Sequence, residues 1–235
     1  MKNTPKSLAL RVLSALLGYP NAELRAAMPE LADALSRTDG LSRTRLAELQ
    51  ALTRWIGAGD PYEVEARYVD TFDRGRATSL HLFEHVHGDS RERGPALVDL
   101  QQTYERAGLR LQGKELPDHL PIVLEFASTQ PDKLAREFLG EMAHILAAVF
   151  SALLERESPY ASVIAAVLEL SGQKVQAVPV VADAALDEAW AEPPAFDGCS
   201  TAGQAKPGAP QPIHIVRNHS NTNNTARQPA QGAHT

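Results

Sequence analysis

The stretch "DKLAREFLGEMAHILAAVFSALLERE", Asp132 to Glu157, decides the fold class. Its apolar side chains recur every three or four residues along the whole stretch, which is the spacing of one face of an α-helix. Glutamates and His144 follow the opposite stripe, as on a helix that packs one face against a core. The stretch therefore predicts one long amphipathic helix. Its apolar positions are Leu134, Phe138, Met142, Ile145, Val149, Phe150 and Leu153.

Helical spacing also fills the preceding segments, with start and stop signals between them. Asn21 can cap a helix that carries apolar residues through Leu35. "DPYE", Asp60 to Glu63, offers a capping carboxylate, a proline suited to the first helical position and the glutamate of a capping box. After the long stretch, Ser158 can cap a shorter helix whose first residue is Pro159.

The pattern predicts an all-α fold, a single-domain helical bundle. No segment alternates polar and apolar residues over a sustained length, and the nearest approach to a strand, "VQAVPVV", contains Pro179. We expect an all-helical domain over residues 1–171 and a connecting segment over 172–191. Residues 192–235 hold six of the sixteen prolines and one aromatic residue. Such a composition offers too little apolar surface to offset the entropy of ordering, so a disordered C-terminal tail is predicted.

Composition and charge exclude several classes of protein. The 235 residues are 43% hydrophobic, enough to bury a core, and the net charge of -6 favours a basic partner over a nucleic acid. One cysteine, Cys199, rules out an internal disulfide and predicts a cytoplasmic protein. Arg11 interrupts the N-terminal apolar stretch, so we expect no signal peptide. The apolar run Ile145 to Leu154 is half the length of a membrane span, which is about 20 residues.

A histidine-rich segment, "LHLFEHVHGDSRERG" from Leu80 to Gly94, is the first candidate site. His81 and His85 would share one face of a helix, and Glu84 could be a third ligand or a base, so a metal-dependent hydrolase is one alternative. The spacing does not match the HExxH arrangement, however, and His87 would lie well round the helix from both other histidines. We therefore favour a structural or surface role and expect no metal.

The second candidate is "ELPDHLPIVLEF", Glu115 to Phe126. Asp118 beside His119 resembles an acid–base pair. Pro121 fits only the first turn of a helix, however, which places the helix start near Asp118 and makes this aspartate the cap. Capping or docking is favoured over catalysis. The sequence also lacks a phosphate-binding glycine loop and a nucleophile elbow, so no catalytic residue is assigned.

Four segments together resemble the NarJ family, the nitrate reductase branch of the TorD/DmsD-type redox-enzyme maturation chaperones. The likeness is dense from about Tyr62 to Phe126 and continues as a helical pattern to about Gly172. The histidine-rich motif is quite specific to the nitrate reductase branch, and the E-x-PDH motif is shared across the superfamily. The segments are "YVDTFDRG" (Tyr68–Gly75), "SLHLFEHVHGDSRERGPALVDL" (Ser79–Leu100), "YERAGL" (Tyr104–Leu109) and "ELPDHLPIVLEF" (Glu115–Phe126).

The resemblance implies an all-α chaperone without enzymatic activity and without a stably bound cofactor. Its client would be the catalytic (alpha) subunit of nitrate reductase, bound through its N-terminal leader in the cytoplasm. The client would be held until the bis-molybdopterin guanine dinucleotide cofactor and an iron–sulfur cluster are inserted, and would then dock at the membrane. A contact with cofactor-delivery proteins stays open, as does a general adaptor for amphipathic helices.

We expect a groove that accepts a basic, amphipathic leader helix. It would lie between the Tyr68–Phe72 face, the Leu82–Glu84 segment and the Glu115–His119 segment. Asp70 and Asp73, with Glu84, are candidate partners for leader cations, and titration of His85 or His87 would make binding pH-sensitive. The family motif contributes the last four residues of the predicted peptide-binding set: Tyr68, Phe72, Phe83, Glu84, His85, Glu115, Pro117, Asp118 and His119.

Overall fold

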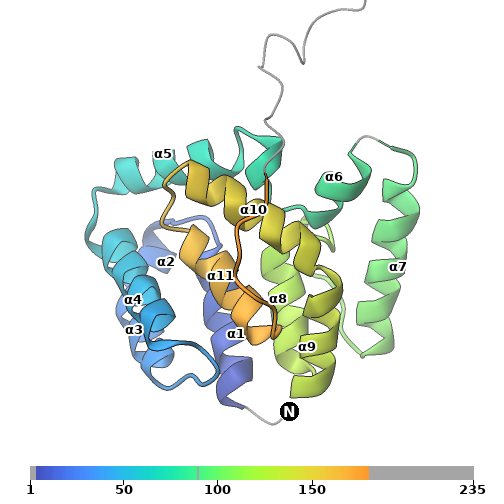
Figure 1. Ribbon diagram of the computed structural model, residues 1–235, viewed down its shortest axis with the longest axis horizontal. Coiled ribbons are helices and arrows are strands. Elements are labelled where there is room, and N and C mark those ends of the chain that lie inside the picture. Colours follow the sequence, from blue (N-terminus) through green and yellow to red (C-terminus); the bar gives the residue numbers. More distant parts are fainter. Residues whose placement is uncertain (1–3, 89, 180–235) are drawn as a thin grey trace, which may run out of the picture. The chain divides into compact units, whose positions relative to one another are not determined.

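A computed structural model describes residues 4–88 and 90–179, and all the regular elements in this part of the chain are helices (Figure 1). The predicted all-α fold is confirmed for these residues. The α-helices are α1 (Pro5–Leu16), α2 (Ala22–Ala26), α3 (Met28–Ser36), α4 (Arg43–Ala58), α5 (Pro61–Phe72), α6 (Leu82–His87), α7 (Arg93–Arg106), α8 (Leu120–Thr129), α9 (Asp132–Glu141), α10 (Ala143–Glu155) and α11 (Ala161–Leu170), and a 3₁₀ turn, η1, spans Arg76–Thr78.

Local start signals predicted two helices correctly. The Asp60 carboxylate accepts hydrogen bonds from the amides of Tyr62 and Glu63 at 3.0 and 3.1 Å, ahead of α5. Asn21 caps α2 in the same way, through the amide of Leu24 at 2.8 Å. Each cap satisfies amides that have no partner within the first turn of a helix.

The core is organised around α11, which is apolar except for Ser162 and Glu169. Every residue from Ala161 to Leu168 is buried, as expected for a helix without a polar face. This helix contacts α1, α4, α9 and α10, and Figure 1 shows it between α1 and α10. Helix α1 also packs along α8 and contacts α3, so the first helix lies between the N-terminal helices and α8.

The predicted single helix from Asp132 to Glu157 is two helices. It breaks at Met142, and the axes of α9 and α10 differ by 68°. The Met142 amide bonds to the carbonyl of Leu139, three residues back, which tightens the turn. Leu139, Met142 and Leu146 all stay buried across the break. Before the bend the prediction of the buried face was wrong, because Leu134 is 52% exposed and the buried residues of α9 are Ala135 and Leu139. The apolar spacing of the sequence continues through the bend, so the periodicity does not reveal it.

Two further helix predictions were wrong at their ends. The helix expected from Asn21 through Leu35 is divided at Ala27, next to Pro29, whose ring nitrogen has no proton to donate to the preceding turn. Ser158 does not cap the last helix: α11 begins at Ala161, and the Ser158 hydroxyl has no hydrogen-bond partner in the described part of the chain.

No single helix in residues 4–88 and 90–179 is both long and apolar enough to cross a membrane; α9 and α10 reach the required length and composition only as a bent pair. Helix α11 ends at Leu170, and the described chain continues without a helix to Pro179. The predicted boundary at 191 and the predicted disordered tail lie outside the described residues, and the division into three parts stays a prediction.

Candidate functional site

Two segments from distant parts of the sequence join at the start of α6 and α8. His81 and His119 form an isolated antiparallel bridge. The amide of Leu120 donates to the Leu80 carbonyl at 2.9 Å, and the amide of Leu82 donates to the Asp118 carbonyl at 3.1 Å. We call residues 80–82 and 118–120 the hinge bridge. It fixes the position of one helix start relative to the other.

Asp118 lies at the centre of the hinge bridge and is fully buried, with no exposed surface. Its Oδ2 accepts a hydrogen bond from the Phe83 amide at 3.0 Å, and its Oδ1 lies 3.4 Å from Nδ1 of His81. Phe83 is the second residue of α6, where helix amides lack an internal partner. The carboxylate therefore caps α6 from across the bridge. The prediction that it caps its own helix was wrong, because His119 occupies the cap position of α8.

The charges in the hinge bridge are set by burial and pairing together. Burial raises the pKa of Asp118, but the hydrogen bonds from His81 and from the Phe83 amide outweigh it and lower the pKa below its ordinary value. The hydrogen bond to Asp118 raises the pKa of His81 against the opposing effect of burial. Burial, helped by the charge of His81, lowers the pKa of His119. The arrangement favours an ionised Asp118–His81 pair beside a neutral His119, with the imidazole centroids 5.1 Å apart.

Side chains of α6 are also bonded to Ser79, the residue just before the hinge bridge. The Ser79 hydroxyl donates to the Glu84 carboxylate at 2.5 Å, and Nε2 of His85 lies 2.9 Å from the Ser79 carbonyl oxygen. The Phe83 ring meets the His87 ring edge-on at 5.8 Å.

The candidate metal ligands thus have different partners. His81 faces Asp118, while Glu84 and His85 bind the hydroxyl and the carbonyl of Ser79. Within residues 4–88 and 90–179 no three side chains of histidine, cysteine, aspartate or glutamate gather as a metal site would require. In the described part of the chain, the candidate ligands of the histidine-rich segment are therefore occupied by contacts with Asp118 and Ser79.

The predicted peptide-binding residues divide into a buried and an accessible group. Pro117 is buried next to Asp118, and its carbonyl accepts the Tyr104 hydroxyl at 2.8 Å, a contact that local sequence patterns could not reveal. Glu115 is exposed, with Oε2 4.0 Å from Nδ1 of His119. The accessible group, exposed or partly exposed, is Phe83, Glu84, His85, Glu115 and His119.

Tyr68 and Phe72 belong to a separate aromatic cluster in the core. The Tyr68 hydroxyl donates to the Leu17 carbonyl at 2.8 Å, and its ring centroid lies 4.9 Å from that of Phe72 and 5.9 Å from that of Tyr160. Both residues are less than a tenth exposed. They anchor α5 to the core, and the charge of Glu115 acts on the Tyr68 hydroxyl by helping to raise its pKa.

Sequence patterns missed the role of His81, which was weighed only as a metal ligand. Its pairing with Asp118 joins positions 37 residues apart. No local signal reports such a contact. Only the combination of an uncapped helix start after His81 and a buried acid elsewhere could have suggested it.

The described residues form a helical frame in which the buried Asp118 is paired with His81, and the accessible side chains lie around this pair. Comparison with known proteins shows the family. The chain belongs to the nitrate reductase delta subunit family, whose family model matches residues 19–166.

Two curated relatives agree with this assignment. The nitrate reductase molybdenum cofactor assembly chaperone NarJ of Escherichia coli K12 is 41% identical over 184 residues, covering 77% of this chain and 78% of NarJ. The probable chaperone NarW of the same strain is 39% identical over 193 residues, covering 78% and 80%. A putative redox enzyme maturation protein of Archaeoglobus fulgidus superposes with a TM-score of 0.48 at 19% identity, over 71% of this chain and 94% of that one.

The predicted membership of the NarJ family is confirmed. So is the prediction of a chaperone, not an enzyme, that assists molybdenum cofactor assembly, because the curated relatives bear that name. The metal-dependent hydrolase built on His81, Glu84 and His85 finds no support in any of these comparisons.

Proposed function

We propose that this chain binds the N-terminal leader of the catalytic (alpha) subunit of nitrate reductase in the cytoplasm. It holds that subunit competent for insertion of bis-molybdopterin guanine dinucleotide until the complex docks at the membrane. Membership of the family supports nitrate reductase as the client. The observation that carries the leader-binding site is the hinge bridge, which joins two segments that both carry accessible acidic and apolar side chains.

The chemistry around the hinge bridge suits a basic amphipathic helix. Glu84 and Glu115 supply negative charge, while Phe83 is partly exposed and Leu116 is 39% exposed. A helix that lays apolar side chains on Phe83 and Leu116 would bring flanking cations to the two glutamates. His85 and His119 complete the accessible set.

The buried members of the predicted set have a supporting role in this proposal. Asp118 holds the start of α6, and Pro117 is anchored by Tyr104. Tyr68 and Phe72 stabilise α5 through the aromatic cluster. Their substitution would weaken leader binding through loss of structure, whereas substitution of Glu84 or Glu115 would act on the contact itself.

A calorimetric titration of the full chain with a synthetic peptide of the client's N-terminus tests the proposal. We expect one-to-one binding with a dissociation constant in the micromolar range, about -8 kcal/mol. Glu115→Gln should weaken it by up to about fivefold, the size of one exposed charge pair. Glu105→Gln, on the exposed face of α7, is the matched control and should leave the affinity unchanged.

Two results would contradict the proposal. An absence of binding by the folded chain would remove the leader as the recognised element. Equal affinity for the leader of an unrelated enzyme would instead favour a general adaptor for amphipathic helices.

A further inference from the structure

Ser79, the residue just before the hinge bridge, holds part of the accessible group in place. Its hydroxyl donates to Oε2 of Glu84 at 2.5 Å and accepts the amide of His81 at 3.2 Å. Its carbonyl oxygen lies 2.9 Å from Nε2 of His85. Ser79 is itself only 7% exposed, so a bound helix would meet Glu84 and His85 and not the serine. Any effect of Ser79 on the leader site therefore passes through these neighbours.

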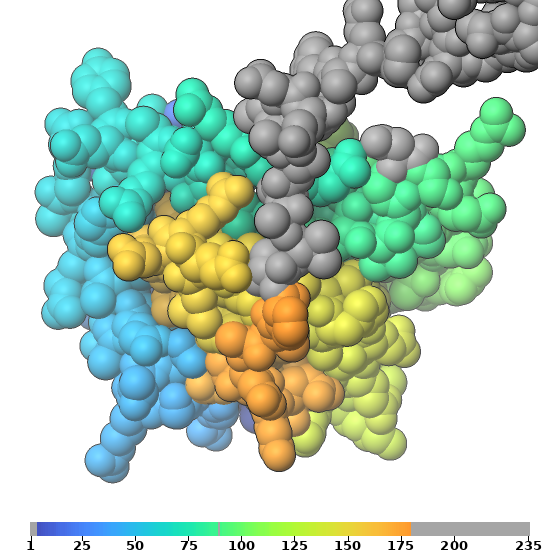
Figure 2. Space-filling model, turned by 45° about the horizontal axis from the view of Figure 1, so that its top comes forward, coloured from blue at the N-terminus to red at the C-terminus, as the bar shows by residue number. Residues whose placement is uncertain are grey.

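The position of Ser79 is fixed by the residues on both sides of it. Before it, Thr78 is fully buried, and its hydroxyl donates to the carbonyl of Thr71 in α5. After it, the Leu80 carbonyl accepts the Leu120 amide at 2.9 Å. Figure 2 shows the side of the molecule on which α6 (green) and α10 (yellow) meet. A donor on such an anchored segment gives the carboxylate it binds on α6 a defined position.

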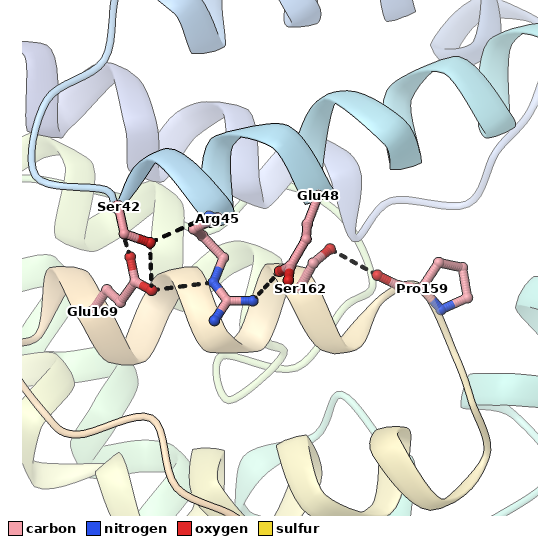
Figure 3. Close-up of polar contacts among 6 residues, drawn as sticks. All are labelled: Ser42, Arg45, Glu48, Pro159, Ser162 and Glu169. Atoms are coloured by element: carbon pink, nitrogen blue, oxygen red, sulfur yellow. Dashed lines mark hydrogen bonds and ion pairs between the residues drawn. The ribbon is translucent and has the colours of Figure 1, made fainter.

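The Ser79 hydroxyl orients Glu84 without cancelling its charge. A contrasting carboxylate, Glu169 of α11, accepts the guanidinium of Arg45 at 3.2 Å and the amide of Ser42 at 3.0 Å (Figure 3). The charge of Glu169 is therefore matched within the fold. Glu84 accepts a hydrogen bond from a neutral hydroxyl and forms no ion pair with any residue in 4–88 and 90–179.

The nearby His81 does not neutralise Glu84. The charge of Glu84 helps to raise the pKa of His81, but the ion pair of His81 is with Asp118, whose Oδ1 lies 3.4 Å from its Nδ1. An ionised Asp118–His81 pair has no net charge. The negative charge of Glu84 therefore remains for a partner's cation.

A carboxylate that is already held in place binds a cation more favourably than a mobile one. An exposed ion pair contributes about 0.2–1 kcal/mol, in part because two long side chains lose conformational freedom when they pair. The hydrogen bond from Ser79 restricts Glu84 before any partner arrives, so less freedom is lost on binding. Because Oε2 of Glu84 is engaged by Ser79, the other carboxylate oxygen is left for the cation.

We propose that Ser79 is a positioning residue for leader recognition, whose hydroxyl holds Glu84 in the orientation that accepts a cation of the basic leader helix. This inference rests on the proposed function, because it requires the leader to bind at the hinge bridge. It adds a residue that the leader does not touch and that sets the strength of the contact with Glu84.

Calorimetric titrations of the full chain with the synthetic leader peptide test this role. The test substitution is Ser79→Ala, which removes the hydroxyl and keeps the carbonyl that contacts His85. The matched control is Ser162→Ala on α11. Ser162 is 8% exposed, and its hydroxyl donates to the Pro159 carbonyl at 2.7 Å (Figure 3).

Two further measurements separate positioning from a general loss of structure. Ser79→Ala also removes the acceptor of the His81 amide, an effect that does not depend on Glu84. The substitution is therefore repeated in a Glu84→Ala background. A second peptide, in which glutamine replaces every lysine and arginine of the leader, is titrated against the wild-type chain and Ser79→Ala.

We expect Ser79→Ala to weaken binding of the leader peptide by about twofold to fivefold, the range of one exposed charge pair. In the Glu84→Ala background the same substitution should cause no further loss, because the side chain that it positions is absent. Ser162→Ala should bind the leader like the wild-type chain. The glutamine peptide should bind the wild-type chain and Ser79→Ala equally.

Three results would overturn the positioning role and leave the proposed function standing. They are equal affinities of the wild-type chain and Ser79→Ala for the leader, an undiminished loss in the Glu84→Ala background, and an equal loss with the glutamine peptide. The last two would show that Ser79 acts on the fold and not on Glu84. An absence of leader binding by the wild-type chain would instead refute the proposed function, and this inference with it.

Discussion

Replacing Asp118 with alanine should destabilise the protein more than any single exposed substitution. The change removes the acceptor of the Phe83 amide and the partner of His81 in a position with no exposed surface. A hydrogen bond to a charged group contributes about 1.5–3 kcal/mol, and a buried donor left without a partner adds its desolvation. We expect a loss of about 3 kcal/mol, a large share of a typical domain stability of about 5–15 kcal/mol.

The isosteric substitution Asp118→Asn separates the contact from the charge. Asparagine fills the same space and its side-chain oxygen can still accept from the Phe83 amide, but it carries no charge for His81. The expected loss is therefore smaller, about 1–2 kcal/mol. Free energies of unfolding from urea titrations give both values, with Asp99→Ala on the exposed side of α7 as the control.

The pH dependence of this loss has a defined sign. The pKa of Asp118 is lowered by folding, so its contribution to stability is present above its ordinary value and is lost as the pH falls through the folded pKa. The pKa of His81 is raised, so its contribution is present below its ordinary value and is lost as the pH rises through the folded pKa. The difference between the wild-type protein and Asp118→Ala should be largest between about pH 4 and 6.5, where both are charged.

His119 acts in the opposite sense to His81. Its pKa is lowered, so its contribution is present above its ordinary value and is lost as the pH falls through the folded pKa. This histidine is present in both proteins, and its effect largely cancels in the comparison. A loss below about 0.5 kcal/mol in Asp118→Ala would refute the assignment of Asp118 as the buried cap of α6. A loss that does not vary between pH 4 and 8 would refute its pairing with a charged His81.

Three further substitutions test other parts of the fold through the same urea titrations. Tyr160→Phe removes a buried hydroxyl that has no partner in the described part of the chain. The free energy of unfolding should stay unchanged or rise by about 1 kcal/mol. A clear loss would mean that the hydroxyl is hydrogen-bonded in solution. Asp60→Ala should lower the free energy of unfolding by about 1 kcal/mol, because two amides of α5 lose their hydrogen-bond acceptor. An unchanged free energy would contradict the role of Asp60 as the cap of α5. Gly59→Ala should lower the free energy of unfolding by about 1–3 kcal/mol, because a Cβ at this position would lie 2.6 Å from the Trp55 carbonyl oxygen. An unchanged free energy would show that the connection between α4 and α5 can shift to make room.

Contacts between near neighbours in the sequence were the predictable part of the fold. Asp60 and Asn21 cap the helices that follow them because the acceptor and the amides lie within three residues. The break at Met142 left no trace in the spacing of apolar residues, which continues from Leu134 through Met142 although Leu134 is exposed. Ser158 carries the cap signature of a serine before a proline, but the helix starts at Ala161.

The hinge bridge shows why the candidate site was harder to predict than the fold. Asp118 was correctly expected to be a cap, but its acceptor serves a helix that begins 36 residues earlier in the sequence, at Leu82. The local signal at Pro121 gave no information on that partner. The partner of a residue that connects two distant segments can be identified only from the folded structure. This applies to Asp118 with Phe83 and to His81 with Asp118.

The charges that a partner meets are those that the fold leaves unpaired. Asp118 is paired with His81 and Arg45 with Glu169, and such pairs present little field to an approaching molecule. Glu115, three residues before the buried Asp118, is exposed to solvent. An exposed charge gains less than about 1 kcal/mol from a matching partner, but it repels a mismatched one, so it acts mainly on selectivity. At the proposed leader site, Glu115 would therefore act mainly on the choice between a basic and an acidic helix, and much less on the affinity for the basic one.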